Sequence, residues 1–141
     1  PIPSGRNIRY ESRMAPPRSI IIAVVDDEPS VRKALVRLFR SAGYEAREFA
    51  SGQEFLGTMP YYRYGCLVLD LHMPGMSGLD VQLDRAFRED PLPVVVITAH
   101  DQPGLRQQCL AAGAFAYLCK PFDDKELLQA VADAIDSWPK T

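Results

Sequence analysis

The sequence predicts an α/β fold in which helices cover both faces of a doubly wound, five-stranded parallel sheet. Strand and helix signals alternate five times between Ile20 and Trp138, and most of the strand segments are nearly unbroken apolar runs. Such runs are typical of parallel strands, which are buried on both faces because each crossover helix packs back onto the sheet.

The first two strand–helix units are clear in the pattern. Residues 20–25 form an apolar strand, and Pro29 suits the first turn of a helix that ends at Gly43. Residues 44–49 form a short second strand, and a brief helix containing Phe55 and Leu56 follows. Residues with a helical period of about 3.6 form the apolar side of the first helix: Val31, Leu35, Leu38, Phe39 and Ala42.

The third strand, residues 66–70, has no polar residue before its last position and is therefore expected at the centre of the sheet. The loop LHMPGMSG leads from it into a helix that continues to about Phe87. Residues 94–98 and 115–119 are the fourth and fifth strands, with a helix over 103–112 between them. Asp123 and Glu126 form a start resembling a capping box for the last helix. Its predicted buried residues are Leu127, Leu128, Val131, Ala134 and Ile135.

Composition narrows the class of protein. At 141 residues the chain is expected to be one domain, and 47% hydrophobic with 24% charged residues is typical of a soluble globular protein. No apolar run reaches the roughly 18–20 residues that span a membrane, and no signal-peptide pattern precedes the first strand, so we expect a cytoplasmic protein with no membrane contact. The odd number of cysteines (Cys66, Cys109 and Cys119) favours buried free thiols over a disulfide or a metal site.

The charge is unevenly distributed. Residues 1–18 carry a net charge of +3 and the remainder −5, which disfavours nucleic-acid binding by the body of the chain. We expect residues 1–18 to be a disordered tail, with Met14 as a candidate native start after residues added in cloning; a basic interaction arm is the competing interpretation. Residues 19–138 are expected to form the folded domain, and 139–141 to begin a linker or end the protein.

Reactive side chains gather at the predicted strand ends. Asp26 and Asp27 follow the first strand, Asp70 and Thr98 end the third and fourth, and Lys120 follows the fifth. Right-handed crossovers bring all carboxyl ends of parallel strands to one edge, where doubly wound sheets bind ligands. Each feature alone has an ordinary explanation, such as a solvated loop, a turn or a surface charge. Their combination at one edge predicts a single site.

Three carboxylates at one edge need a counter-charge. Two unit charges about 4 Å apart repel by about 4 kcal/mol at an effective dielectric near 20, and Lys120 offsets only part of this. An all-oxygen set of ligands favours Mg²⁺, with Mn²⁺ as a substitute. Because Mg²⁺ commonly joins carboxylates to a phosphate, the site is expected to receive a phosphoryl group, and a carboxylate within reach can become an acyl phosphate.

The two histidines, His72 and His100, each lie two residues beyond a predicted site residue. We expect them at the rim of the site with Met73, where their side chains control the access of water. Two imidazoles alone make a poor metal site, so a separate histidine metal site is the less favoured interpretation.

Four motifs make the chain from Ile20 to about Trp138 resemble the receiver domain of a two-component response regulator: VVDDEP, LVLDLHMPGMSGLD, VVVITAHD and AGAFAYLCKPF. The segments SVRKAL and GYEAREFASGQEFL most resemble the FixJ-like subgroup of transcription regulators. The resemblance implies the flavodoxin/CheY-like fold with strand order 2-1-3-4-5. It also implies a sensor histidine kinase as partner and a DNA-binding output domain outside this chain.

By this resemblance Asp70 is the phosphoacceptor. Asp27 binds Mg²⁺ directly, Asp26 binds it partly through water, and the backbone carbonyl of His72 is the third protein ligand.

The resemblance also assigns the switch residues. Thr98 and Lys120 bind phosphoryl oxygens, the bond from Lys120 to Pro121 is cis, and the rotamer of Tyr117 follows Thr98. The domain is then a phosphorylation-dependent switch that catalyses only its own phosphorylation and dephosphorylation. The surface that changes is formed by helix 103–112, strand 115–119 and the last helix, and a phosphorylation-dependent homodimer is expected there.

Two other classes of protein share part of this pattern. A haloacid-dehalogenase-like Mg²⁺ phosphatase also combines an aspartate nucleophile, a hydroxyl, a lysine and Mg²⁺. It carries its nucleophile after the first strand with a second acid two residues on, whereas Asp26 and Asp27 are adjacent. A flavodoxin-like FMN carrier shares the fold, but the carboxylates of DDEP would repel the phosphate of the cofactor.

Overall fold

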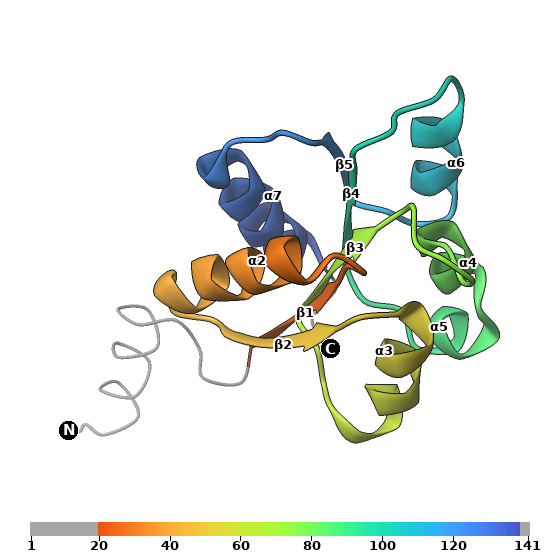
Figure 1. Ribbon diagram of the computed structural model, residues 1–141. Coiled ribbons are helices and arrows are strands. Elements are labelled where there is room, and N and C mark those ends of the chain that lie inside the picture. The colour runs from red at the N-terminus through yellow and green to blue at the C-terminus, as the bar shows by residue number, and fades with distance from the viewer. Residues whose placement is uncertain (1–19, 139–141) are drawn as a thin grey trace.

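Five parallel strands form one sheet in the order β2-β1-β3-β4-β5, which confirms the predicted fold class and strand order (Figure 1). The computed structural model describes residues 20–138. The strands are β1 (Ile21–Val25), β2 (Glu45–Phe49), β3 (Cys66–Asp70), β4 (Val94–Thr98) and β5 (Ala116–Cys119). The expectations for residues 1–18 and 139–141 lie outside the described residues.

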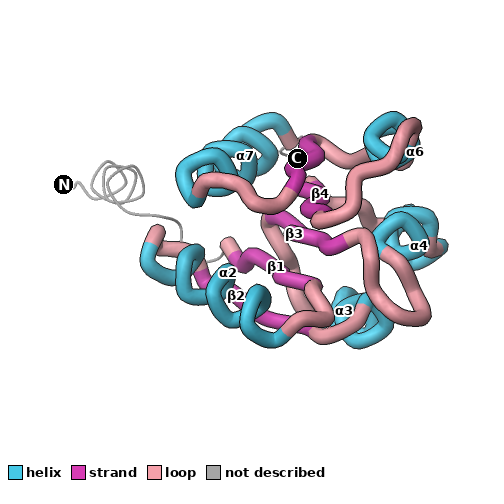
Figure 2. Tube along the Cα trace, turned by 45° about the horizontal axis from the view of Figure 1, so that its top comes forward, coloured by secondary structure: helices cyan, strands magenta, loops and turns pink. Residues whose placement is uncertain are grey.

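The helices lie in two layers. On one face of the sheet are α2 (Pro29–Ser41) and α7 (Asp124–Ser137). On the other are α3 (Gly52–Thr58), α4 (Gly78–Leu83), α5 (Arg85–Glu89) and α6 (Leu105–Ala111), with a 3₁₀ turn, η1 (Met59–Tyr61), after α3. Figure 2 shows the same sandwich in a turned view, with the strands between α2 and α7 on one side and α3, α4 and α6 on the other. None of the described helices is long and apolar enough to cross a membrane.

Alternation along the strands divides the core in two. In β1, Ile22 and Val24 face α2 and α7, while Ala23 and Val25 face the other layer. Successive side chains of a strand point to opposite faces, so a run that is apolar at every position can fill both clusters. This is why the central strands contain almost no polar residue before their carboxyl ends.

The first helix largely follows its predicted pattern. Pro29 occupies its first turn, and Leu35 and Phe39 are buried. Ala42, predicted on the buried side, is exposed because the helix ends at Ser41 and Ala42 is its C-cap. Val36, outside the predicted set, is buried instead.

The predicted single helix up to Phe87 is wrong in its continuity, because α4 and α5 are separate helices. Asp84 lies between them in an extended conformation (φ −65°, ψ 141°), and its carboxylate accepts a hydrogen bond from the backbone N–H of Ala86. An aspartate can satisfy the free N–H groups at a helix start, so it ends one helix and caps the next.

Capping at the last helix is only partly as predicted. Asp123 is the N-cap, but its carboxylate accepts from the N–H of Lys125, and the predicted return contact from Glu126 is not observed. A complete capping box instead opens α4, where Ser77 and Asp80 each bind the other's backbone N–H.

The three cysteines are all free thiols, as predicted, but only two of them are buried. Cys66 lies inside the sheet, and burial raises its pKa to about 12, which keeps it a protonated and unreactive thiol. Cys119, predicted to be buried, is exposed because β5 is an edge strand and Cys119 is its last residue.

Candidate functional site

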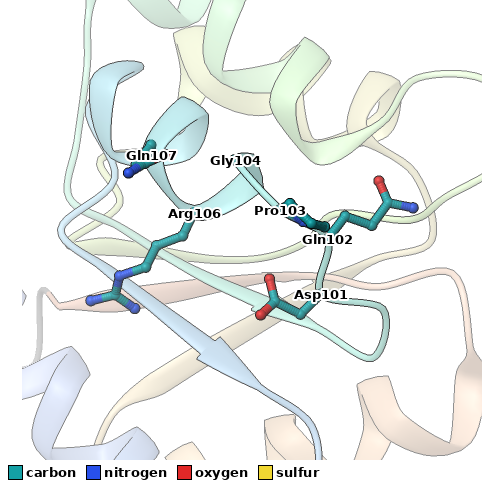
Figure 3. Close-up of a pocket in the computed structure, with 6 residues that line it drawn as sticks. All are labelled: Asp101, Gln102, Pro103, Gly104, Arg106 and Gln107. Carbon is teal, nitrogen blue, oxygen red and sulfur yellow. The ribbon is translucent and has the colours of Figure 1, made fainter.

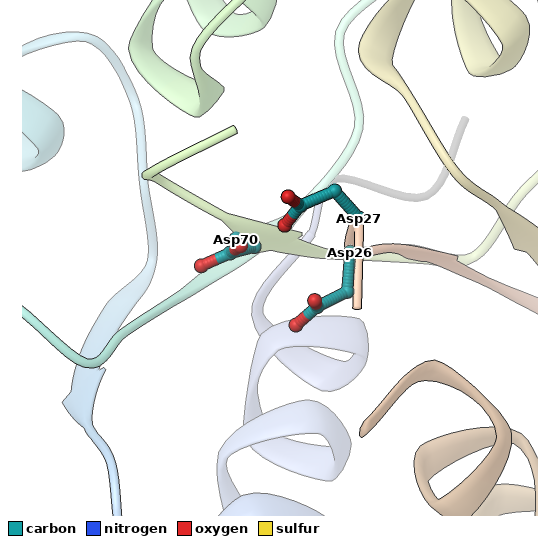
Figure 4. Close-up of side chains that lie close together, drawn as sticks. All are labelled: Asp26, Asp27 and Asp70. Carbon is teal, nitrogen blue, oxygen red and sulfur yellow. The ribbon is translucent and has the colours of Figure 1, made fainter. Parts of the chain in front are cut away.

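Three carboxylates meet at the carboxyl edge of the sheet (Figure 4). Asp26 and Asp27 directly follow β1, Asp70 ends β3, and the two strands are paired neighbours. One oxygen from each aspartate lies within 4.8 Å of the others. Among residues 20–138, this is the one set of three or more carboxylate, imidazole or thiol side chains close enough to hold a single metal ion.

The two acids after β1 have different surroundings. Asp26 is fully buried; its Oδ1 accepts a hydrogen bond from the N–H of Glu28 (2.9 Å) and its Oδ2 accepts from Nζ of Lys120 (3.1 Å). Asp27 is exposed. The carboxylate of Asp26 is therefore held by the protein, while that of Asp27 is open to solvent and to a cation.

The environment of Asp70 disfavours its negative charge. Burial and, after it, the carboxylates of Asp26 and Asp27 raise the pKa of Asp70 to about 6, and the ammonium of Lys120 opposes them only in part. Lys120 Nζ lies 3.7 Å from Asp70 Oδ1. The set of acids is thus short of positive charge, and a divalent cation among these oxygens would supply it.

The loop after β3 folds back against the backbone of Asp70. The N–H of Gly78 donates to the carbonyl of Leu71 (3.0 Å), and a Cβ on Gly78 would lie 2.5 Å from the carbonyl oxygen of Asp70. Only a residue without a side chain allows this approach. Gly78 therefore fixes where the loop that contains His72 passes the site.

Thr98 and Lys120 lie on the ends of the next two strands. Thr98 is fully buried, and its Oγ1 accepts a hydrogen bond from the N–H of His100 (3.1 Å). Its carbonyl accepts from the N–H of Lys120 (2.7 Å), which ties the two strand ends together. The Lys120–Pro121 bond is cis, as the resemblance implied.

Tyr117 connects the sheet to the loop after β4. Its ring is buried in the core, and its hydroxyl donates to Oδ1 of Asp101 (2.7 Å). Burial and this hydrogen bond raise the pKa of the Tyr117 hydroxyl. Arg106 of α6 donates to the backbone carbonyl of Tyr117 (3.3 Å). Figure 3 shows Asp101 and Arg106 among the residues that line an open hollow of about 400 Å³ at this loop.

The rim is made by two histidines. Nε2 of His72 lies 2.9 Å from the carbonyl oxygen of His100, and the two rings meet edge to face with centroids 5.4 Å apart. Met73, predicted at the rim, is instead buried in the core cluster under α3 to α6. Met73 lies three residues past Asp70, and its side chain packs into the helical layer rather than facing solvent.

Two residues near the site are not predicted by the sequence. Arg32 of α2 donates to the backbone carbonyl of Asp26, and Asp101 accepts the Tyr117 hydroxyl. Both contacts join residues whose relative placement depends on loop geometry. From the sequence alone, a charged residue on a helix or loop is expected to be solvated.

Comparison with known proteins gives one family. Residues 22–132 match the family described as "Response regulator receiver domain". The chain is 43% identical over 117 residues to nodulation protein W of Bradyrhizobium diazoefficiens, covering 82% of this chain and 51% of that protein. It is 33% identical over 114 residues to the transcriptional regulatory protein FixJ of the same organism, covering 81% of this chain and 56% of that protein. The chain thus spans about half the length of these curated relatives.

Solved structures agree with this family. A crystal structure of FixJ-N superposes with a TM-score of 0.79 at 31% identity, covering 89% of this chain and 100% of that one. A response regulator receiver protein from Burkholderia phymatum superposes with a TM-score of 0.73 at 42% identity, covering 86% of this chain and 99% of that one. These matches give no support to the phosphatase alternative. The fold, the motifs and the relatives agree: the chain belongs to the receiver domains of two-component response regulators.

Proposed function

We propose that this receiver domain accepts a phosphoryl group from a sensor histidine kinase on Asp70. The observation that supports the proposal most strongly is the buried Asp70 carboxylate beside Lys120 and the two acids after β1, in a chain of this family. In the transfer, an oxygen of Asp70 forms a bond to phosphorus while the bond from phosphorus to the donor imidazole nitrogen breaks.

The residues around Asp70 fit Mg²⁺, with Mn²⁺ as a substitute, because the donor set is all oxygen. Asp27 would bind the ion directly, Asp26 partly through water, and His72 through its backbone carbonyl. When bound, Mg²⁺ neutralises charge on the phosphoryl oxygens. Lys120 adds a second positive charge, and its contact with Asp26 already holds it at the site.

Phosphorylation would be passed on through Thr98. We propose that its hydroxyl leaves the N–H of His100 and donates to a phosphoryl oxygen, drawing the loop after β4 inward. Asp101 lies three residues further along that loop, so this movement would take its carboxylate away from Tyr117. The ring of Tyr117 is then free to change rotamer.

The surface expected to respond is formed by α6, β5 and α7. It presents two exposed apolar side chains, Leu110 at 37% and Phe115 at 42% exposure, which suit a contact between two copies of the domain. We propose a phosphorylation-dependent homodimer on this surface. The relatives are about twice as long and include transcriptional regulators, so we also propose control of a DNA-binding output domain.

The experiment is to treat the wild-type protein and Asp70→Asn with acetyl phosphate and Mg²⁺ and to measure their intact masses. We expect a single phosphoryl adduct on the wild type and none on Asp70→Asn, because the amide is not a nucleophile. Asp27→Asn serves as a control that keeps Asp70 and should retain a slower reaction. An undiminished adduct on Asp70→Asn would contradict the proposal.

A further inference from the structure

We propose that Arg32 is a positioning residue that fixes the peptide unit between Asp26 and Asp27 and so presents Asp27 to the metal ion. This inference rests on the proposed Mg²⁺-dependent phosphorylation, and it gives a role to Arg32, which the sequence alone did not mark as a site residue.

The guanidinium of Arg32 bridges two elements at the carboxyl edge of the sheet. Its Nη1 donates to the carbonyl oxygen of Asp26 (2.9 Å), and its Nε donates to Oε1 of Glu48 in β2 (2.8 Å). The side chain is only 13% exposed although it carries a charge. Because the guanidinium is planar and rigid, holding it at two nitrogens fixes its orientation.

Every other polar group of Asp26 already has a partner. Its N–H donates to the carbonyl of Phe49 (3.2 Å), and its two carboxylate oxygens accept from Glu28 and Lys120. The carbonyl is the remaining group, and α2 supplies its donor through Arg32. Asp26 is therefore held from β2, from its own loop, from the end of β5 and from α2.

The carbonyl of Asp26 lies in the same rigid plane as the N–H of Asp27. Fixing that carbonyl fixes the direction in which the chain enters Asp27. The carboxylate of Asp27 is exposed and cannot rely on packing for its placement. The hydrogen bond from Arg32 thus determines the position of the acid with the most open side chain at the site.

The positive charge of Arg32 would affect Mg²⁺ binding in the opposite direction to the positioning of Asp27. Hydrogen bonding to Arg32 lowers the pKa of Glu48, so Glu48 stays ionised and compensates the guanidinium. Whatever positive charge remains near the acids would repel a cation. Removing Arg32 should therefore strengthen Mg²⁺ binding if charge dominates and weaken it if positioning dominates. The two explanations predict opposite signs.

The test measures Mg²⁺ affinity by titration calorimetry for the wild type, Arg32→Met, Arg32→Lys and Lys33→Met. Lys33 is a matched control because it lies next to Arg32 on α2, is 60% exposed and approaches Glu48 (3.6 Å), but makes no hydrogen bond to Asp26. We expect Arg32→Met to weaken Mg²⁺ binding roughly three- to tenfold, a fraction of what one charge-assisted hydrogen bond contributes. Lys33→Met should bind Mg²⁺ as the wild type does or slightly more tightly.

A rate measurement separates positioning from catalysis. At saturating Mg²⁺ the rate of phosphorylation by acetyl phosphate should be within about twofold of the wild type for Arg32→Met, because Arg32 touches no reacting atom. Arg32→Lys keeps the charge without the planar fork, and its Mg²⁺ affinity should still fall at least twofold. This second variant also decides the matter if Arg32→Met does not fold.

The outcomes are distinct. Equal or tighter Mg²⁺ binding by Arg32→Met, or wild-type affinity in Arg32→Lys, would overturn the positioning role while the wild type still forms its Asp70 adduct. If the wild type itself neither binds Mg²⁺ nor forms the adduct, the proposed function fails instead.

Discussion

At the scale of single residues, the site is a set of acids whose charges conflict in the folded chain. Asp70 is 5% exposed and lies beside Asp26 and Asp27, and Lys120 compensates only part of their charge. Such a group destabilises the protein whenever it is ionised without a cation. Its titration should therefore be visible in the stability of the metal-free protein.

The direction of the pKa shift of Asp70 decides how stability changes with pH. The pKa of Asp70 is raised from 3.8 to about 6 in the folded protein, so the native state holds a proton that the unfolded state releases. Stability from this group is present at low pH and is lost as the pH rises through about 6. Asp70→Asn removes the ionisation and should be more stable than the wild type by about 1–3 kcal/mol at about pH 7.5, with a smaller difference at about pH 4.5.

Urea unfolding with a metal chelator at these two pH values checks the prediction. The prediction is wrong if the wild type is the more stable protein at the higher pH, or if the difference in unfolding free energy between the two proteins does not change with pH. Either result would show that ionisation of Asp70 does not destabilise the folded protein.

The second prediction at this scale concerns Asp27. Asp27→Ala removes an exposed carboxylate from the three that lie within 4.8 Å of one another, and the remaining acids are more deeply buried. We expect its phosphorylation to need at least tenfold more Mg²⁺, as loss of a directly bound carboxylate would require. Phosphorylation rates across a Mg²⁺ titration decide it, with the exposed neighbour Glu28→Ala as control. The same Mg²⁺ dependence in Asp27→Ala and the wild type would show that Asp27 is a solvated loop residue and not a metal ligand.

The identity of the central acids was predictable because residue type, strand end and parallel topology together place them. Arg32 and Asp101 were not predictable in this way. Each acts through a hydrogen bond across a loop, to the Asp26 carbonyl and to the Tyr117 hydroxyl, and nothing in the local sequence specifies such a partner.

At the scale of elements, the loop after β4 joins the acids to the surface of α6, β5 and α7. Thr98 begins this loop with its hydroxyl bound to the N–H of His100, and Asp101 ends the same segment with its carboxylate on Tyr117. We propose that a change at one end of these four residues is transmitted to the other, which would allow one hydrogen bond to drive the switch.

Thr98→Ala should separate phosphorylation from the response. Phosphorylation should persist, slowed roughly severalfold, because Asp70, Lys120 and the acids remain. The lost hydrogen bond to a charged oxygen is worth roughly 1.5–3 kcal/mol, enough to remove most of a bias of a few kcal/mol between two states. Sedimentation velocity of beryllofluoride-treated proteins should then show a dimer for the wild type and for Thr98→Ser, and a weaker dimer or none for Thr98→Ala. An equal response from all three would mean that the signal takes another route.

The elements themselves were largely predictable. All of the strands except β2 are short apolar runs, and the observed bounds of each strand differ from the predicted ones by at most one residue. The break at Asp84 was not predicted, because an acid followed by an arginine is as common inside an exposed helix as at a helix end. The carboxylate of Asp84 instead caps a separate helix, α5, whose Phe87 is buried in the core.

At the scale of the whole molecule, the order of the strands turns a linear sequence into one site. Crossing from β1 to β3 places Asp26 and Asp27 beside Asp70, and β4 and β5 then add Thr98 and Lys120 in turn. The alternation of strands and helices together with the right-handed crossover predicted a parallel sheet with helices on both faces, whereas the strand order came from the resemblance to receiver domains. The proposed kinase partner and the proposed output domain depend on surfaces and chain segments that this topology does not specify.

The most direct measurement locates the phosphoryl group in the native protein without any substitution. The wild type is treated with acetyl phosphate and Mg²⁺, reduced with borohydride, which converts an aspartyl phosphate to homoserine, and digested for peptide sequencing by mass spectrometry. We expect homoserine at Asp70 alone, dependent on Mg²⁺ and abolished by a chelator. Homoserine at Asp26 or Asp27, or an adduct that resists reduction, would contradict it.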